Sequence, residues 1–275
     1  MTWVKKMEFK ILEKTPILLK FKLEGLSAAY VNALRRIILE EVPVLAIDEC
    51  IFIENSSVVF DEVLAHKLGL IPLHTDLDLL VPFDECSCEG TGCPSCSTML
   101  TLEKEGISNG EVVMVYSGDI NPQNPALAPI SEKIPLVPLR KGQKIVLEAI
   151  AKLGRGKYHA KWQPVAAVAY KNIPIIEIDK EKCDGCGQCV PNCLKQILEM
   201  KGDEVSIKDI YRCDMCKLCQ EACEMDGIKV TPKKDAFIFW LESTGAIPAD
   251  KILEKAIDSL RGKFIELDEK VKGLK

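Results

Sequence analysis

The chain carries the same cysteine spacing twice, and the two copies lie thirty residues apart. The first copy is Cys183, Cys186, Cys189 and Cys193, and the second is Cys213, Cys216, Cys219 and Cys223. Each copy reads Cys-x2-Cys-x2-Cys-x3-Cys. Three cysteines within seven residues can wrap one face of a metal cluster as a tight loop, which leaves backbone amides free to donate hydrogen bonds to its sulfur atoms. The fourth thiolate has to come from elsewhere, so the two copies constrain this part of the chain to a compact fold held by metal.

This spacing is the ligand run of bacterial-type [4Fe–4S] ferredoxins, in which the last cysteine of each run binds the other cluster. By that rule the first cluster is held by Cys183, Cys186, Cys189 and Cys223, and the second by Cys213, Cys216, Cys219 and Cys193. A pair of zinc ribbons, or disulfides in a secreted domain, are the alternatives. Ribbons, however, use two cysteine pairs with a longer spacer between them. Leu194 and Glu224 stand where ferredoxins usually have proline, which bears on reduction potential more than on cluster binding.

A separate group of four cysteines lies in a short loop with glycine and proline, at Cys86, Cys88, Cys93 and Cys96. Four thiolates with no open position predict a structural Zn²⁺ site, and the metal supplies the folding energy of a loop with few apolar residues. A third iron–sulfur centre is the alternative for this group. The thirteenth cysteine, Cys50, lies in an apolar run and is interpreted as a small buried hydrophobe.

Length, charge and cysteine use limit the class of protein. A chain of 275 residues has room for two or three domains. The net charge of -5 and pI near 5.5 give no electrostatic footprint for nucleic acid, so we expect no direct contact with DNA. No stretch approaches the ~20 apolar residues of a membrane span, and the first residues do not resemble a signal peptide. Thirteen cysteines without an export signal predict a cytoplasmic protein with thiolates held by metal.

Apolar periodicity predicts a mixture of helices and strands, that is, an α+β fold. An alternating pattern predicts one half-buried strand from Met7 to Leu23, and a helix follows from Ser27 to about Glu41. A shorter helix is predicted from Asp61 to Gly69. Further strands are predicted at 46–53, 57–60, 110–116 and 145–151, with a long irregular connection at 121–138. The composition changes near residue 171 and changes back near 231, so the cysteine repeats form an insertion rather than a tail.

The C-terminal segment predicts a long amphipathic helix after Pro248. Its apolar residues follow one another at alternating spacings of four and three: Leu253, Ile257, Leu260, Phe264, Leu267 and Val271. This is a heptad seam sustained for about 20 residues, or ~30 Å of helix. A seam of this length must be covered, either by the chain's own domain or by a helix of a partner, and we favour the partner.

Several segments together resemble one family. The run from Phe21 to Pro43 looks like the dimerisation helix of RNA polymerase α-type subunits. The segments 66–73, 157–164 and 237–245 are also similar to that family, so the resemblance covers nearly the whole chain. The inserted double ferredoxin-like module points to the archaeal D-subunit branch. The cysteine loop resembles that of the eukaryotic third-largest subunit.

The resemblance implies a specific domain organisation and a specific partner. It implies a discontinuous α-type dimerisation domain at 1–45 and 233–275, an inserted mostly-β domain at 46–171 with the cysteine loop at 86–96, and an inserted ferredoxin-like module at 172–232. Residues 27–41 and 250–271 would bind the small L subunit in an α-dimer-like heterodimer. The expected interface residues are Val31, Leu34, Arg35, Ile38, Leu253, Ile257, Leu260, Phe264, Leu267 and Val271. The family also implies contacts with the small N and P subunits and with the two largest subunits.

The function implied is that of a non-catalytic scaffold for the assembly of DNA-directed RNA polymerase. No catalytic residue is expected in this chain, and nucleotidyl transfer would belong to other subunits. Two [4Fe–4S] clusters and one Zn²⁺ would be mainly structural, with clusters near solvent open to oxidation. The alternative is a ferredoxin-type electron carrier or an oxidoreductase subunit. Against it, the sequence has no G-x-G-x-x-G dinucleotide fingerprint, and most of the chain lies outside the cluster module.

Overall fold

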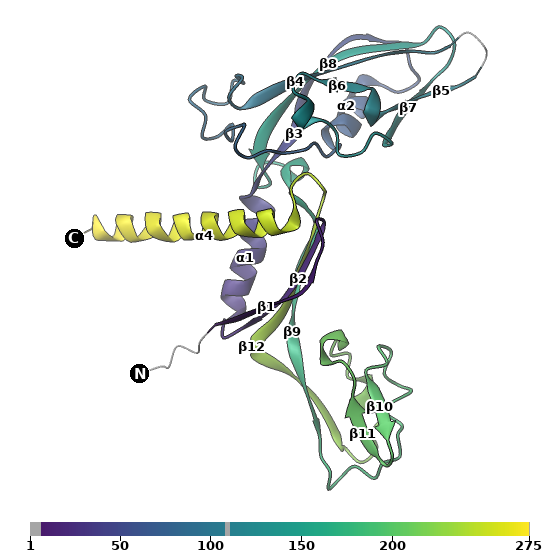
Figure 1. Ribbon diagram of the computed structural model, residues 1–275, viewed down its shortest axis with the longest axis vertical. Helices are drawn as coiled ribbons and strands as arrows, with labels where there is room; N and C mark the ends of the chain where they lie inside the picture. Colours follow the sequence, from purple (N-terminus) through teal and green to yellow (C-terminus); the bar gives the residue numbers. More distant parts are fainter. Residues whose placement is uncertain (1–6, 108–110, 275) are drawn as a thin grey trace. The chain divides into compact units, whose positions relative to one another are not determined.

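The computed structural model describes residues 7–107 and 111–274. The described chain forms two compact units. The first comprises residues 7–14, 19–33 and 169–240, and the second comprises residues 15–18, 34–107, 111–168 and 241–274. Helix α1 (Ala28–Glu40) and the strands β9 (Val165–Ile178) and β12 (Ile228–Ser243) run through both units (Figure 1). Within the described ranges, no helix combines the length and apolar character needed to cross a membrane.

The first unit contains a four-stranded sheet in the order β1-β2-β12-β9. Strands β1 (Glu8–Lys14) and β2 (Leu18–Glu24) form an antiparallel hairpin in which Phe9 lies opposite Leu23. The single strand expected from Met7 to Leu23 is therefore wrong. The pattern is interrupted at Pro16, which has no N–H for a strand ladder. The turn is closed by Thr15, whose N–H donates to the carbonyl oxygen of Leu18 at 2.7 Å.

Aromatic packing holds this sheet together. Phe21 and Phe239 are fully buried, and their rings stack with centroids 5.1 Å apart. Tyr170 stacks on the Phe239 ring from β9 at 6.3 Å. Beyond this sheet, the two cysteine runs flank a small antiparallel hairpin of β10 (Leu198–Lys201) and β11 (Glu204–Ile207), and the second run includes the short helix α3 (Leu218–Glu221).

The second unit is built on a four-stranded sheet in the order β3-β8-β4-β6. Its strands are β3 (Pro43–Asn55), β8 (Lys144–Arg155), β4 (Ser97–Glu105) and β6 (Ile120–Pro122). Helix α2 (Asp61–Gly69) buries Leu64 and Leu68 in the apolar core of this unit. Strands β5 (Val113–Tyr116) and β7 (Pro135–Leu139) form a separate pair. Helix α4 (Ala249–Lys272) ends the described chain.

The strand predictions for this unit succeed in part. The strand expected at 46–53 lies within β3, and the one expected at 145–151 lies within β8. The strand expected at 110–116 begins at Val113, and residue 110 lies outside the described residues. The connection at 121–138 is less irregular than expected, because it contains β7. Residues 57–60 form no strand, since the Asn55 side chain accepts hydrogen bonds from the N–H and hydroxyl of Ser57 and bends the chain there.

The end of β8 packs closely against the end of α1. A Cβ added at Gly156 would lie 1.9 Å from the carbonyl oxygen of Leu39, in the last turn of the helix. The N–H of Lys157 donates to the carbonyl oxygen of Glu40 at 3.1 Å. The last carbonyls of a helix have no partner within the helix, and here the strand end supplies one.

We expect Gly156→Ala to lower the free energy of unfolding by about 2–3 kcal/mol, because the added methyl group forces the helix end away from the strand. Gly262→Ala in α4 is the control, since a Cβ there meets no atom within 4 Å. It should raise helix stability by up to ~1 kcal/mol. Urea unfolding followed by tryptophan fluorescence measures both. Equal shifts in the same direction would contradict the close approach.

Candidate metal centres and partner-binding surface

The loop that carries Cys86, Cys88, Cys93 and Cys96 is fastened to the edge of strand β8. The N–H of Phe83 donates to the carbonyl oxygen of Leu153 at 2.8 Å, and the N–H of Leu153 donates to that of Cys96 at 3.1 Å. Glu89, Gly90 and Gly92 adopt left-handed backbone conformations, with φ of 52°, 82° and 94°. These turns fold the loop back on itself and bring the four thiols together.

The spacing of the four sulfur atoms fits a single tetrahedral ion. All four Sγ atoms lie within 4.8 Å of one another. The Sγ atoms of Cys86 and Cys93 are 3.5 Å apart, as are those of Cys88 and Cys96, and those of Cys93 and Cys96 are 3.9 Å apart. Zinc–thiolate bonds of ~2.3 Å place tetrahedral ligands about 3.8 Å from one another. A cubane carries its four thiolates on separate irons and so holds them farther apart. The geometry therefore favours one ion over a third iron–sulfur centre.

The loop also stabilises negative charge on sulfur. Burial raises the pKa of the Cys88 thiol, but hydrogen bonds from the Gly92 and Gly90 amides and from neighbouring thiols outweigh it and lower that pKa to about 6. Burial, with hydrogen bonds among the same thiols, raises the pKa of Cys96 to about 12. The Cys88 thiolate therefore forms readily, whereas the Cys96 thiol keeps its proton. A bound cation would favour the thiolate form of all four cysteines.

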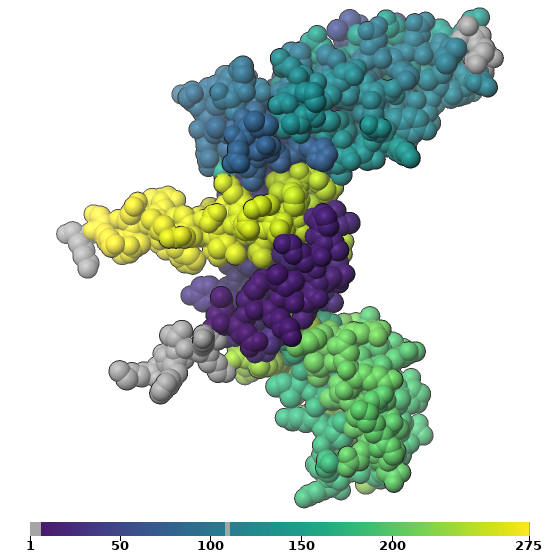
Figure 2. All heavy atoms as spheres, in the orientation of Figure 1, coloured from purple at the N-terminus to yellow at the C-terminus, as the bar shows by residue number. Residues whose placement is uncertain are grey.

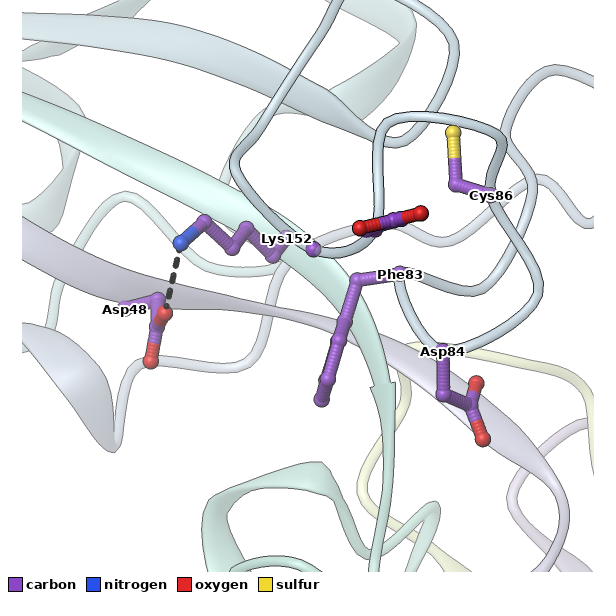
Figure 3. Close-up of a pocket in the computed structure, with 7 residues that line it drawn as sticks. Asp48, Phe83, Asp84, Cys86 and Lys152 are labelled. Carbon is purple, nitrogen blue, oxygen red and sulfur yellow. Dashed lines mark ion pairs between the residues drawn. The ribbon is translucent and has the colours of Figure 1, made fainter.

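A shallow cavity of about 580 Å³ adjoins this loop (Figure 3). The Asp48 carboxylate in its lining forms two ion pairs, with Lys152 Nζ at 3.2 Å and with Lys161 Nζ at 2.6 Å. Burial opposes ionisation of Asp48, yet the two lysines hold the pKa of its carboxyl below the ordinary value. Cys50, from the same strand as Asp48, is half-buried against the apolar core, and burial raises its pKa to about 11. Its thiol is therefore neutral, consistent with the packing role that we expected.

The two cysteine runs contribute to each other's groups. Cys183, Cys186 and Cys189 of the first run line one cavity together with Cys223 of the second. The lining of this cavity agrees with an exchange of fourth cysteines, which stays a prediction. In the second run, burial and then repulsion from Cys193, Cys213 and Cys216 raise the pKa of Cys219 to about 11.

The repeat extends to the backbone. In the first run, Gly185, Gly187 and Gln196 adopt left-handed conformations with φ of 74°, 71° and 53°. Thirty residues later, Met215, Lys217 and Asp226 do the same, with φ of 56°, 62° and 51°. The two loops thus share the positions of their left-handed residues. At two of the three positions the second loop has a side chain where the first has glycine, which costs free energy. Such strain persists only where the surroundings enforce it.

Backbone amides donate to two sulfur atoms of the second cysteine run. The N–H of Gly227 donates to Cys223 Sγ at 3.2 Å, and that of Met215 donates to Cys213 Sγ at 3.4 Å. Lys171 of β9 fastens the second loop, because its Nζ donates to the carbonyl oxygen of Cys213 at 2.9 Å and pairs with Asp214 at 2.8 Å. Sequence reasoning missed Lys171, which lies far from the loop along the chain.

Helix α4 divides into a covered and an uncovered half. Ala249, Ile252, Leu253 and Ala256 are buried, whereas the apolar residues farther along are about half exposed. The exposed set is Ile257 (51%), Phe264 (51%), Ile265 (50%), Leu267 (56%) and Val271 (51%). In Figure 2 the C-terminal half of α4 (yellow) protrudes, and no other segment of the same unit covers its visible face. Among the described residues of this unit, the predicted seam is therefore buried only in the first turns of the helix.

Three residues of the expected interface need correction. Val31, Ile38 and Leu253 are only 1%, 0% and 8% exposed, so they pack within their own chain and present no surface to a partner. Leu34, Arg35 and Leu260 are partly exposed. The 3.6-residue periodicity identifies a buried stripe but does not say what covers it.

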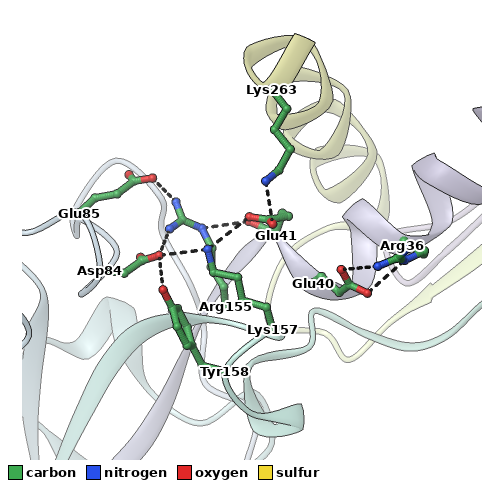
Figure 4. A network of polar contacts seen from close by, with 9 residues as sticks. All are labelled: Arg36, Glu40, Glu41, Asp84, Glu85, Arg155, Lys157, Tyr158 and Lys263. Atoms are coloured by element: carbon green, nitrogen blue, oxygen red, sulfur yellow. Dashed lines mark hydrogen bonds and ion pairs between the residues drawn. The ribbon is translucent and has the colours of Figure 1, made fainter. Parts of the chain in front are cut away.

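Sequence reasoning also missed a charged cluster at the end of α1 (Figure 4). Arg155 of β8 contacts Asp84 and Glu85 beside the cysteine loop, and also the carbonyl oxygen of Glu41. Burial raises the pKa of the Asp84 carboxyl, but Arg155, Tyr158 and Lys157 together lower it below the ordinary value. The resemblance of segment 157–164 was the one signal in the sequence that pointed to this region.

Residues 20–264 match the model of the RNA polymerase Rpb3/Rpb11 dimerisation domain, and the chain belongs to that family. It is 40% identical to the DNA-directed RNA polymerase subunit Rpo3 of Methanosarcina acetivorans, over 95% of this chain and 97% of that protein. The subunit of the same name from Methanosarcina mazei is 41% identical over the same shares. The one from Archaeoglobus fulgidus is 40% identical over 95% of this chain and 97% of its own length.

Gly185→Ala should weaken metal retention in the first cysteine loop. The residue has φ of +74°, and its added Cβ would lie 2.6 Å from the carbonyl oxygen of Asp203, so we expect a cost of about 2 kcal/mol. Lys217→Gly is the control, because it removes a left-handed side chain with φ of 62°. The rate of metal loss to a chelator should rise in the first variant and stay equal or fall in the second. A first variant that retains metal like the parent protein would contradict the strain argument.

Proposed function

We propose that the chain is a non-catalytic assembly subunit of DNA-directed RNA polymerase and that it forms a heterodimer with a small L-type subunit. The family match over residues 20–264 supports a dimerising protein, and the relatives are named as polymerase subunits. The heterodimer is the α-dimer-like platform on which the large subunits assemble. Nucleotidyl transfer takes place in other subunits.

The observation that carries this proposal is the uncovered half of α4. Four apolar side chains of the seam, Ile257, Phe264, Leu267 and Val271, are each about half exposed along a 24-residue helix. Burying each of them stabilises a complex by roughly 1 kcal/mol or more at ~25 cal/mol per Å². A helix of the partner that packs along the seam supplies this burial, since heptad spacing is suited to helix–helix contact. Leu34, Arg35 and Leu260 border the same interface.

The metals belong to the proposal as well. Cys86, Cys88, Cys93 and Cys96 hold one Zn²⁺, which suits their sulfur spacing. Cys183, Cys186, Cys189 and Cys223 hold one [4Fe–4S] cluster, and Cys193, Cys213, Cys216 and Cys219 hold the second. When bound, these groups serve mainly to fold their loops, and clusters close to solvent are open to oxidation, because Cys186 and Cys216 are exposed.

The domain organisation follows from these roles. The α-type dimerisation domain comprises 1–45 and 233–275, the β-rich domain with the zinc loop comprises 46–171, and the ferredoxin-like module comprises 172–232. The two inserted parts offer surface to the N and P subunits and to the two largest subunits, without direct contact with DNA. Such a protein works in the cytoplasm. Electron transfer is the weaker reading, because it gives no role to the exposed seam.

We expect the double substitution Phe264→Ala with Leu267→Ala to weaken binding of the L-type subunit about 100-fold, because it truncates two central anchors of the seam. Thermal stability of the free chain should hardly change, since both side chains are about half exposed. Lys255→Ala with Glu269→Ala, on the opposite face of the same helix, is the control. Titration calorimetry measures all three proteins. Unchanged binding in the first pair would remove α4 from the interface.

Iron content should reveal which cysteines act together. Cys183→Ser and Cys223→Ser should each lower iron from about eight to about four atoms per chain, and their combination should cost no more than either alone. Combining Cys183→Ser with Cys213→Ser should remove nearly all iron. All of these variants should still bind the L-type subunit, because α4 lies outside the module. Nearly complete iron loss in the Cys183–Cys223 pair would rule out crossed ligation.

A further inference from the structure

Arg155 joins the zinc loop to the end of helix α1. Its Nε donates to the carbonyl oxygen of Glu41 at 3.2 Å, and its two terminal nitrogens donate to the carboxylates of Asp84 and Glu85 (Figure 4). The side chain of Arg155 is only 11% exposed. A planar guanidinium can serve three acceptors in fixed directions, which a lysine ammonium cannot do on a flexible stem.

Glu41 extends this connection to helix α4. Its carboxylate pairs with Lys263 of α4 at 2.9 Å and with Lys157 at 3.7 Å, and Lys157 also lies 3.5 Å from Asp84. The Asp84 carboxylate accepts a further hydrogen bond from the hydroxyl of Tyr158 at 3.2 Å. One continuous set of charged contacts therefore runs from the cysteine loop through the end of α1 to α4.

The two carboxylates stand directly before the first cysteine of the loop. Phe83 is held in place independently of any metal, because its N–H bonds to β8 and its ring lies 5.3 Å from that of Trp162. Asp84 and Glu85 follow this anchor and precede Cys86, so their positions depend on how Cys86 is held. Loss of the metal therefore loosens the chain beyond Phe83 and leaves the core of the unit in place.

We infer that Arg155 is a positioning residue that transmits metal occupancy at Cys86, Cys88, Cys93 and Cys96 to the end of α1 and to its contact with α4. With metal bound, Asp84 and Glu85 hold Arg155, and Arg155 caps the helix. Without metal, a nearly buried cation loses fixed partners, which is costly, and it turns away from Glu41. This inference deepens the proposed function, since α1 and α4 are the helices of the proposed dimer.

Hydrogen exchange of the full chain, without any partner, tests the connection. The readout is the exchange rate of the amides at 37–41 and at Lys157. Cys93→Ser, which removes one ligand, should speed this exchange about tenfold through local opening of the helix end. In an Arg155→Gln background the same change should add less than about twofold, because the link is already absent. Arg140→Gln, an exposed arginine of the same unit, is the matched control and should leave the effect of Cys93→Ser intact.

A second variant tests the link while metal stays bound. Glu85→Gln combined with Asp84→Asn should reproduce the faster exchange of the amides at 37–41 with zinc content unchanged. Arg155→Lys, which keeps the charge but not the planar guanidinium, should also exchange faster there than the parent chain. Amides of β5 and β7 report the rest of the unit and should not respond. Equal effects of Cys93→Ser with and without Arg155 would overturn the inference, as would faster exchange in β5 and β7 to the same degree.

These outcomes are separate from those that test the proposed function. A chain that fails to bind an L-type subunit can still show coupling between metal and helix end. A chain that binds the subunit can equally lack the coupling. The two results therefore judge the dimer and the role of Arg155 independently.

Discussion

Repulsion among thiolates is the constraint on which this structure depends. One group of four cysteines has all its Sγ atoms within 4.8 Å of one another, and Cys183, Cys186, Cys189 and Cys223 line a single cavity. Negative charges at such distances repel strongly when they are partly withdrawn from water. Bound cations would offset this repulsion, which fits our proposal that the loops fold together with their metals. The strained backbone at Met215 and Lys217 is the local cost of that arrangement.

The sequence predicts those parts of the molecule that are determined by residues close to one another in the chain. Cysteine spacing defines which thiols can share a loop, and the cavity lined by Cys183, Cys186, Cys189 and Cys223 agrees with the crossed ligation that we propose. The long terminal helix follows from heptad spacing, and it runs from Ala249 to Lys272. The errors arise where one residue overrides a pattern. Pro16 divides an alternating run into two strands, and the Asn55 side chain bends what would otherwise continue as a strand.

The parts that sequence could not predict depend on contacts between distant segments. Arg155 bonds the carbonyl oxygen of Glu41 across 114 positions of chain, and Lys171 fastens a loop 42 positions away. A charged residue in a sequence is most often solvated, and nothing in its neighbours shows that it will be nearly buried. The same limit explains Val31 and Ile38, since an apolar stripe predicts burial without identifying the covering surface.

The two halves of α4 show why such a helix suits an assembly subunit. Its first turns bury Ile252 and Leu253 within the chain, so its direction is set before any partner arrives. The later turns keep their apolar seam in water, at a free-energy cost that only association removes. A helix anchored at one end loses less conformational entropy on binding than a free segment does, because its backbone is already ordered. The ion pair between Lys263 and Glu41 joins the exposed half of α4 to the end of α1, so a shift of that end alters how the seam is presented.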